Sequence, residues 1–192
     1  MKLTLDDIAD LRAYEREREE FRERVIALKR LRRVSVGPIV TLVFENRDTV
    51  RFQIQEMARV ERLITDEQIQ AELDVYNPLV PEPGRLTATL FVELTSDGDL
   101  REWLPKLVGI ERAVELRIGE RRVRCVPDEA HEQQLTREEI TASVHYIRFE
   151  LTPDEVAAFE RESVVLAVDH PAYGEGTPLS DDTKASLLRD LR

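Results

Sequence analysis

The sequence is poor in the residues that disulfides, zinc sites and phosphate loops require. It holds one cysteine, three histidines and seven glycines in 192 residues. One cysteine excludes an internal disulfide, and a structural zinc site needs four clustered Cys or His ligands. The glycines form neither a G-x-G-x-x-G nor a Walker A pattern, and no G-x-S-x-G elbow occurs. These absences exclude zinc fingers, nucleotide-cradling loops and serine hydrolases of that type, whereas a carboxylate-rich iron or manganese site stays open.

Excess positive charge and long apolar runs are also missing. The formal net charge is −11, whereas nucleic-acid binders concentrate basic residues on one face. No apolar run approaches the ~20 residues of a membrane span. The first residues, MKLTLDD, contain no apolar signal core. We therefore expect a soluble cytoplasmic protein with no nucleic-acid partner and no membrane association.

A long helix is predicted for residues 5–31. Thr4 and Asp7 form a variant of the capping box, and apolar residues then recur at three- and four-residue steps. In YEREREEFRER, oppositely charged residues four apart support a solvated face. Such a helix would be roughly 40 Å long at about 1.5 Å per residue, so either it kinks or it projects from the domain. Its narrow apolar stripe also suits a helix-mediated homodimer.

Strands and helices mix along the rest of the chain without strict alternation. A glycine and a proline at 37–38 break the chain before a strand at 39–44, and a helix is predicted for 48–63. Further strands are predicted at 85–95, in a hairpin at 113–126, at 142–151 and at 163–168. Further helices are predicted to begin at residues 65, 97, 152 and 180. A capping pattern recurs at 136–139. We therefore predict one α+β domain over residues 1–192, with a largely antiparallel sheet and helices packed on it. If any part projects from this domain, it is the long helix within residues 1–33.

One candidate site follows the strand at 39–44, in the stretch FENRDTVRFQIQEM. Turn and cap residues precede a helix whose first amides form a small mouth that attracts anions, with Arg47 and Arg51 beside it. Gln53 and Gln55 matter because one of them must face away from the apolar side, whether the period is that of a helix or a strand. The residues proposed to bind a ligand or a partner are Glu45, Asn46, Arg47, Asp48, Arg51, Gln53 and Gln55. A capped corner without a ligand is the alternative.

A second candidate site lies in VDHPAYGEGTPLS, directly after the most apolar predicted strand. We expect a loop here, stiffened by proline and loosened by glycine, and loops on rigid scaffolds often carry functional side chains. A histidine side chain can change its charge near neutral pH, and Asp169 is placed to orient His170 as a base or a metal ligand. Asp169, His170 and Tyr173, joined by Glu45 or Glu56, are thus candidates for an acid-base or iron site. The alternative is a rigid loop in which Asp169 caps a turn and Tyr173 covers the sheet.

Two other chemically active side chains fit structural roles. His145 shares one face of a predicted strand with Ile147 and Phe149, which is typical of a core or sheet-surface histidine. Cys125 lies beside valines in a predicted strand and is expected to behave as a small hydrophobe. Its neighbouring arginines would point to the opposite face of the strand.

The chain resembles a bacterial family catalogued as domain of unknown function 3501. The stretches that carry the resemblance are VIALKRLRRVSVGPIVTLVFENRDTVRFQIQEM, LDVYNPLVP, LTATLFVEL and VDHPAY. The likeness covers essentially the whole chain. Family members are often encoded near rubrerythrin-like and iron-sulfur proteins, so the resemblance implies a redox or iron-related setting.

Three functional hypotheses follow from these observations. The first is an accessory or binding protein that holds a protein partner or a small ligand through residues 45–55. The second is an enzyme or metalloprotein that uses Asp169, His170 and Tyr173. The third is a homodimer formed through the first helix without a small ligand. The sequence itself indicates neither a cofactor nor a particular metal.

Overall fold

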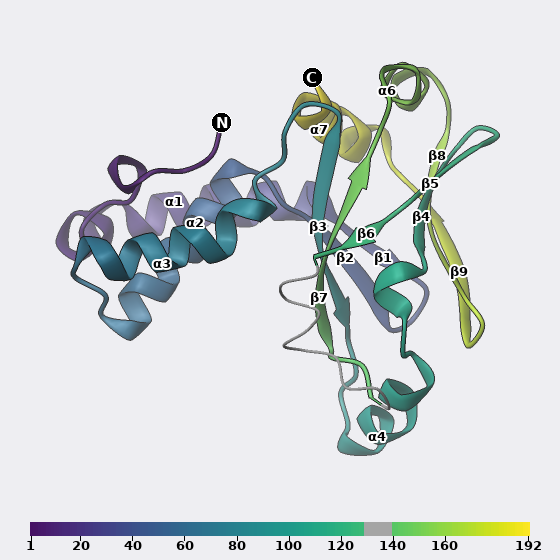
Figure 1. Cartoon of the computed structure of the whole chain (residues 1–192), viewed down its shortest axis with the longest axis horizontal. Helices are drawn as coiled ribbons and strands as arrows, with labels where there is room; N and C mark the ends of the chain where they lie inside the picture. Colours follow the sequence, from purple (N-terminus) through teal and green to yellow (C-terminus); the bar gives the residue numbers. More distant parts are fainter. Residues whose placement is uncertain (129–139) are drawn as a thin grey trace.

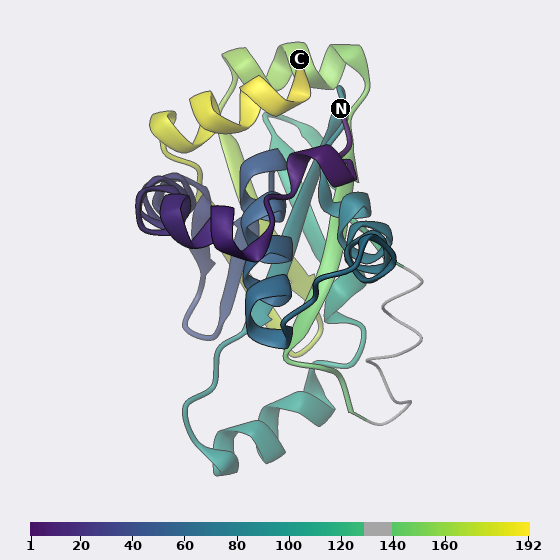
Figure 2. The ribbon, with the colours of Figure 1, turned by 90° about the vertical axis from the view of Figure 1, so that its left-hand side faces the viewer.

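The computed structural model describes residues 1–128 and 140–192 and shows three layers (Figure 1). A helical layer covers one face of a five-stranded sheet, and a four-stranded sheet packs against its other face. Figure 2 looks onto the helical side and shows these helices in front of the sheet. Every strand pairing among the described residues is antiparallel. The predicted α+β class is confirmed.

The five-stranded sheet has the order β1-β2-β3-β7-β6. Its strands are β1 (Arg33–Val36), β2 (Val40–Phe44), β3 (Arg85–Val92), β6 (Val126–Pro127) and β7 (Val144–Glu150). Strand β3 pairs with β7 so that Leu90 lies opposite His145 and Thr89 lies opposite Tyr146. Successive side chains of a strand point to opposite faces. Leu90 and His145 therefore face the second sheet, while Thr89 and Tyr146 face the helices.

The four-stranded sheet has the order β5-β4-β8-β9. Its strands are β4 (Val114–Ile118), β5 (Arg121–Arg124), β8 (Val164–His170) and β9 (Tyr173–Pro178). The main core lies between the two sheets, where Phe149, Leu116 and Leu166 are fully buried. Burying a side chain of this size stabilises the fold by about 1.5–3 kcal/mol.

Helices close both ends of this sandwich (Figure 1). Helix α4 (Asp97–Lys106) lies at one end, and α6 (Pro153–Arg161) and α7 (Asp181–Leu191) lie at the other. Thr152 and Ser180 cap α6 and α7 by accepting hydrogen bonds from backbone amides three residues on. The predicted beginnings of these helices are therefore confirmed. The capping pattern at 136–139 lies outside the described residues.

The helical layer consists of α1, α2 and α3 with two short 3₁₀ turns. Its elements are η1 (Leu5–Asp7), α1 (Leu11–Arg32), α2 (Arg47–Glu61), α3 (Asp66–Tyr76) and η2 (Asn77–Leu79); a third turn, η3 (Ile110–Arg112), precedes β4. Helix α1 buries Tyr14, Phe21 and Val25. The ring of Phe21 meets Phe52 of α2 edge-on, with centroids 5.7 Å apart. The apolar stripe of α1 is thus covered within the chain.

The prediction of one helix over residues 5–31 is wrong at its beginning. The chain makes only η1 there, and Ile8 is extended with φ −103° and ψ 111°. Gln55 of α2 binds the next residue, because the Ala9 amide donates to Gln55 Oε1 at 2.8 Å and Gln55 Nε2 donates to the Ala9 carbonyl at 3.1 Å. Asp10 then caps α1 by accepting from the Ala13 amide at 2.8 Å. A tertiary contact with α2 therefore interrupts the helical pattern.

Strand β1 has no counterpart among the predicted elements. Arg33, which lies in the segment 1–33 assigned to the first helix, is the first residue of β1. The break at Gly37 makes a hairpin between β1 and β2, and Gly37 adopts φ +67°, a conformation that favours glycine.

Candidate functional site

A cavity of about 170 Å³ lies between the helical layer and the five-stranded sheet. We call it the Glu45 pocket. Its apolar and aromatic lining consists of Val50, Tyr76, Leu79, Phe91, Val144 and Tyr146. Its polar lining consists of Lys29, Glu45, Gln53 and Thr89. An apolar cavity of about 150 Å³ is large enough to hold benzene, so the Glu45 pocket suits a small organic molecule.

The sheet side of the Glu45 pocket follows from strand alternation. Thr89 and Phe91 lie two residues apart on β3, and their partners on β7 are Tyr146 and Val144. Side chains two residues apart share a face, so all four point toward the helices. The intervening Leu90 turns into the sandwich and is fully buried there.

Glu45 supplies a buried carboxylate to this pocket. It directly follows β2 and is 9% exposed. The Thr89 hydroxyl donates to Glu45 Oε1 at 2.7 Å, and the Thr49 hydroxyl donates to Oε2. Within residues 1–128 and 140–192, no Lys or Arg forms an ion pair with this carboxylate. The nearby Arg32 donates to the backbone carbonyl of Glu45, at 3.2 Å, and not to its carboxylate. Its ion pair is with Asp190.

The two tyrosines of the Glu45 pocket are neutral at physiological pH. Burial raises the pKa of Tyr146 to about 12, and the charge of Glu45 acts in the same direction. Burial also raises the pKa of Tyr76, although a hydrogen bond with Gln53 opposes this shift. Both phenols therefore serve as hydrogen-bonding and aromatic surfaces, because both stay protonated near neutral pH.

Lys29 brings a positive charge to the edge of the pocket. It lies in the last turn of α1 and is half-buried. In the part of the chain that the structure describes, its ammonium group makes no ion pair. The pocket thus combines an apolar body with one buried carboxylate and one amine at its rim, a composition that suits binding and orientation of a ligand.

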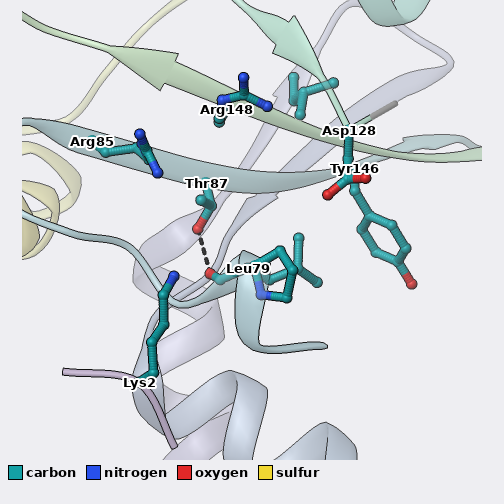
Figure 3. A pocket seen from close by; sticks show the side chains of 9 residues that line it. Lys2, Leu79, Arg85, Thr87, Asp128, Tyr146 and Arg148 are labelled. Carbon is teal, nitrogen blue, oxygen red and sulfur yellow. Dashed lines mark hydrogen bonds between the residues drawn. The ribbon is translucent and has the colours of Figure 1, made fainter. Parts of the chain in front are cut away.

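A second pocket of about 180 Å³ adjoins the first and shares Leu79 and Tyr146 with it. Figure 3 shows Arg85 and Arg148 on neighbouring strands, with the Tyr146 ring pointing away from them. Its cations are paired with acids, because both arginines contact Glu150, at 3.2 and 3.0 Å, and Lys2 contacts Glu82 at 3.5 Å. The Thr87 hydroxyl, drawn with a dashed line, donates to the Leu79 carbonyl.

Two of the residues predicted to bind a ligand line the Glu45 pocket, namely Glu45 and Gln53. Gln55 faces the other way and holds the Ala9 backbone. One of the two glutamines thus faces the pocket and the other a backbone segment.

The other predicted binding residues fix the beginning of α2 and the N-terminal segment. The Asn46 side chain accepts from the Thr49 amide at 3.0 Å, so the expected anion mouth is capped from within the chain. Arg47 pairs with Asp7, and Arg51 pairs with Glu17 at 2.7 Å. Asp48 is exposed in the first turn of α2, where a negative charge complements the helix dipole.

The second candidate site is a hairpin, and the expectation of a loop after residue 168 is wrong. Asp169 and His170 are the last residues of β8, and Tyr173 begins β9. Five successive residue pairs of β8 and β9, from Leu166 with Thr177 to His170 with Tyr173, continue the ladder to the turn. Gly174 and Gly176, which were expected to loosen the chain, lie within β9 and pair with Asp169 and Ala167 of β8.

The three side chains of this hairpin do not converge. Asp169 pairs with Arg124 at 3.2 Å. His170 Nε2 lies 3.0 Å from the Val108 carbonyl, and Nδ1 accepts from the Ala172 amide at 3.2 Å. The Tyr173 hydroxyl donates to the Val36 carbonyl at 2.6 Å.

The two candidate sites also lie apart. Tyr173 contacts the β1–β2 turn, whereas Glu45 follows the opposite end of β2. Glu56 belongs to neither site, because it binds Tyr14 and Arg18 between α1 and α2.

The aromatic and hydroxyl residues of the Glu45 pocket were not among the predicted site residues. Alternation of β3 assigns its leucines and alanine to one face, and this leaves Thr87, Thr89 and Phe91 on the other. In the sequence, the pocket could have been found from this feature: a central strand that carries hydroxyl and aromatic side chains on the face opposite its leucines. His145 and Cys125 are buried, as expected for structural residues.

Two further properties of the described residues bear on the functional class. Among the described residues, no group of three or more His, Cys, Asp or Glu side chains is arranged to hold a metal ion. Within the same residues, no helix has the length and apolar character needed to cross a membrane.

Comparison with known proteins gives a family and a structural relative. A family model described as "Protein of unknown function (DUF3501)" matches residues 2–191. A crystal structure titled as a novel protein of unknown function from Burkholderia pseudomallei K96243 is 40% identical in sequence. It superposes with a TM-score of 0.92, and the match covers 100% of both chains. No curated protein matches.

Proposed function

Because the chain belongs to the family of proteins of unknown function DUF3501, we propose a function from its pocket geometry: it is a binding protein that holds a small ligand in the Glu45 pocket. This develops the hypothesis that residues 45–55 hold a ligand, with Glu45 and Gln53 as the contributing side chains. The role is that of an accessory protein that carries or senses its ligand.

The buried carboxylate of Glu45 is the observation that carries this proposal. Buried charges are normally paired with an opposite charge or bound to a metal. Here two threonine hydroxyls hold the carboxylate against an aromatic cavity. Each carboxylate oxygen retains a further lone pair for a ligand. A purely structural corner would not need an ionisable group at the wall of a cavity.

The redox or iron-related setting implied by the family resemblance is part of the same proposal, as the context in which the ligand is used. It makes iron content a quantity worth measuring on the purified protein. An enzyme built on Asp169, His170 and Tyr173 is the alternative. We propose the binding role in preference, because these three side chains make separate contacts.

Native mass spectrometry, with metal analysis, on protein purified from its own host tests the proposal. Val144→Trp would fill the pocket from β7. Val75→Trp is the matched control, because Val75 is 42% exposed on α3 and does not line the pocket. We expect an extra small-molecule mass on the wild type and on Val75→Trp, and its loss from Val144→Trp.

A bare chain in all three samples would overturn the binding proposal. So would an extra mass that survives in Val144→Trp. Stoichiometric iron that disappears in His170→Ala, with the fold retained, would instead support the enzyme or metalloprotein alternative.

A further inference from the structure

The negative charge of Glu45 has no positive partner among the described residues of the pocket wall. The hydroxyls of Thr49 and Thr89 are neutral donors, so they orient the carboxylate without balancing its charge. Lys29 lines the same pocket but forms no ion pair with Glu45 within 4 Å. Its long stem lets the ammonium group turn to water. A ligand with a positive charge would supply the missing partner.

The rest of the pocket also favours a cation over an anion. The rings of Tyr76, Phe91 and Tyr146 line it, and the faces of aromatic rings attract ammonium groups. The raised pKa values of both tyrosines keep these rings neutral. The charges of Glu72 and Glu61 also act on Tyr76, so the surroundings of this ring are acidic. Lys29 is the one pocket-lining cation within the described residues.

We propose that the ligand of the Glu45 pocket is a small protonated amine with an apolar body. The ammonium group donates to the free lone pairs of the Glu45 carboxylate, and the apolar body lies among Tyr76, Phe91 and Tyr146. The cavity of about 170 Å³ limits the body to roughly the size of one benzene ring. This inference rests on the proposed function, because it names the class of ligand for the same pocket.

Calorimetric titration of the full chain with three probes of one shape tests this assignment. Benzylamine is cationic at neutral pH, benzyl alcohol is its neutral counterpart, and benzoate is anionic. We expect saturable binding of benzylamine, with an affinity about tenfold or more above that of benzyl alcohol, and no binding of benzoate. This comparison needs only the wild-type protein.

Glu45→Gln should abolish the preference for benzylamine over benzyl alcohol. The amide keeps the size of the side chain and an acceptor for a threonine hydroxyl while it removes the charge. Glu93→Gln is the matched control, since Glu93 also accepts from a threonine, Thr41, at 2.7 Å, but does not line the pocket. Circular dichroism of both variants checks their folding.

Failure of this inference is distinguishable from failure of the proposed function. If benzyl alcohol or benzoate binds as tightly as benzylamine, or if Glu45→Gln retains the preference, the amine assignment is overturned and the binding role stands. If the molecule bound to the protein from its host lacks an amine, the same conclusion follows. If no probe binds and the chain from its host is bare, both are overturned.

Discussion

Glu56 joins α1 to α2 through a set of charge-assisted hydrogen bonds. It accepts from the Tyr14 hydroxyl at 2.7 Å and from Arg18 Nε at 2.8 Å, and Arg59 adds a contact at 3.2 Å. The Arg18 guanidinium is the main reason why the pKa of Glu56 falls to about 2, against burial, which acts in the other direction. Burial, and after it the same carboxylate, raises the pKa of the Tyr14 phenol.

At the residue scale, we therefore expect Glu56→Gln to destabilise the protein by on the order of 2 kcal/mol at pH 7. A carboxyl group with a lowered folded-state pKa contributes its full stability above its unfolded-state pKa. That contribution is lost as the pH falls toward the folded-state pKa. The difference in unfolding free energy between wild type and variant should thus shrink between about pH 5 and pH 2. Chemical denaturation at several pH values measures it.

Glu20→Gln is the control for this substitution. Glu20 pairs with Arg24 on the exposed face of α1, where its side chain is 80% exposed. Exposed pairs contribute about 0–1 kcal/mol, so this variant should unfold like the wild type. A loss in Glu56→Gln that stays constant from pH 7 to pH 3 would contradict the linkage argument.

Cys125 gives a second prediction at this scale. Its side chain is buried, its thiol donates to the Glu111 carbonyl at 3.1 Å, and burial raises its pKa to about 12. Since the thiolate is the reactive species, the native protein should react with a disulfide reagent at pH 8 many-fold more slowly than the unfolded chain. The rate of thiol modification, followed with and without denaturant, measures both values. Equal rates would show that the thiol is accessible in the native protein.

At the scale of elements, Tyr173 fastens the β1–β2 hairpin to β9. Its hydroxyl donates to the Val36 carbonyl and accepts from the Ile39 amide at 3.3 Å. The approach is close, because a Cβ on Gly37 would lie 2.4 Å from the Tyr173 hydroxyl. The ring meets Trp103 of α4 edge-on at 6.3 Å. Thr177 of β9 adds a bond to the Ser35 carbonyl at 2.7 Å.

We expect Tyr173→Phe to cost about 1 kcal/mol of unfolding free energy, because it removes these hydrogen bonds and keeps the ring. Amide exchange should become faster at Ile39, which loses its acceptor. Exchange at Phe91, on the central strand β3, is the internal reference and should change only with global stability. Unchanged exchange at Ile39 would contradict the fastening role.

For the whole molecule, the helical layer bears on the hypothesis of a homodimer formed through the first helix. The apolar residues Tyr14, Phe21 and Val25 of α1 are 0–3% exposed because α2 covers them. Helix α1 therefore does not present its stripe to a second chain. Ile26 and Leu31 remain partly exposed on it, at 37% and 38%.

We accordingly expect light scattering to give the mass of one chain, 22.2 kDa, at every dilution. A mass near twice that value, falling on dilution, would support the helix-mediated homodimer instead. In that event Leu31→Glu should abolish the dimer. Ile140→Glu is the control, because it places the same charge outside the helical layer, and it should leave the dimer intact.

The sequence by itself determined the fold class and most of the elements, although not β1 or β9. Capping residues such as Thr65, Thr152 and Ser180 bind amides three residues on, so each signal is contained in a few consecutive residues. Strand alternation in β3 is equally local, and it separates Leu90 from Thr89 whatever the neighbouring strand is. Such short-range patterns predicted α2, α6, α7 and the antiparallel sheet.

Only the tertiary structure decided where polar side chains meet. Glu45 and Thr89 are 44 residues apart in sequence and 2.7 Å apart in space, and Gln55 interrupts a predicted helix by binding Ala9, 46 residues away. The segment after His170 likewise forms a hairpin, because β9 pairs with β8. Periodicity assigns a side chain to a face, whereas the packing of helices on the sheet decides what that face encloses. The Glu45 pocket exists for this reason, and no stretch of consecutive residues encodes it.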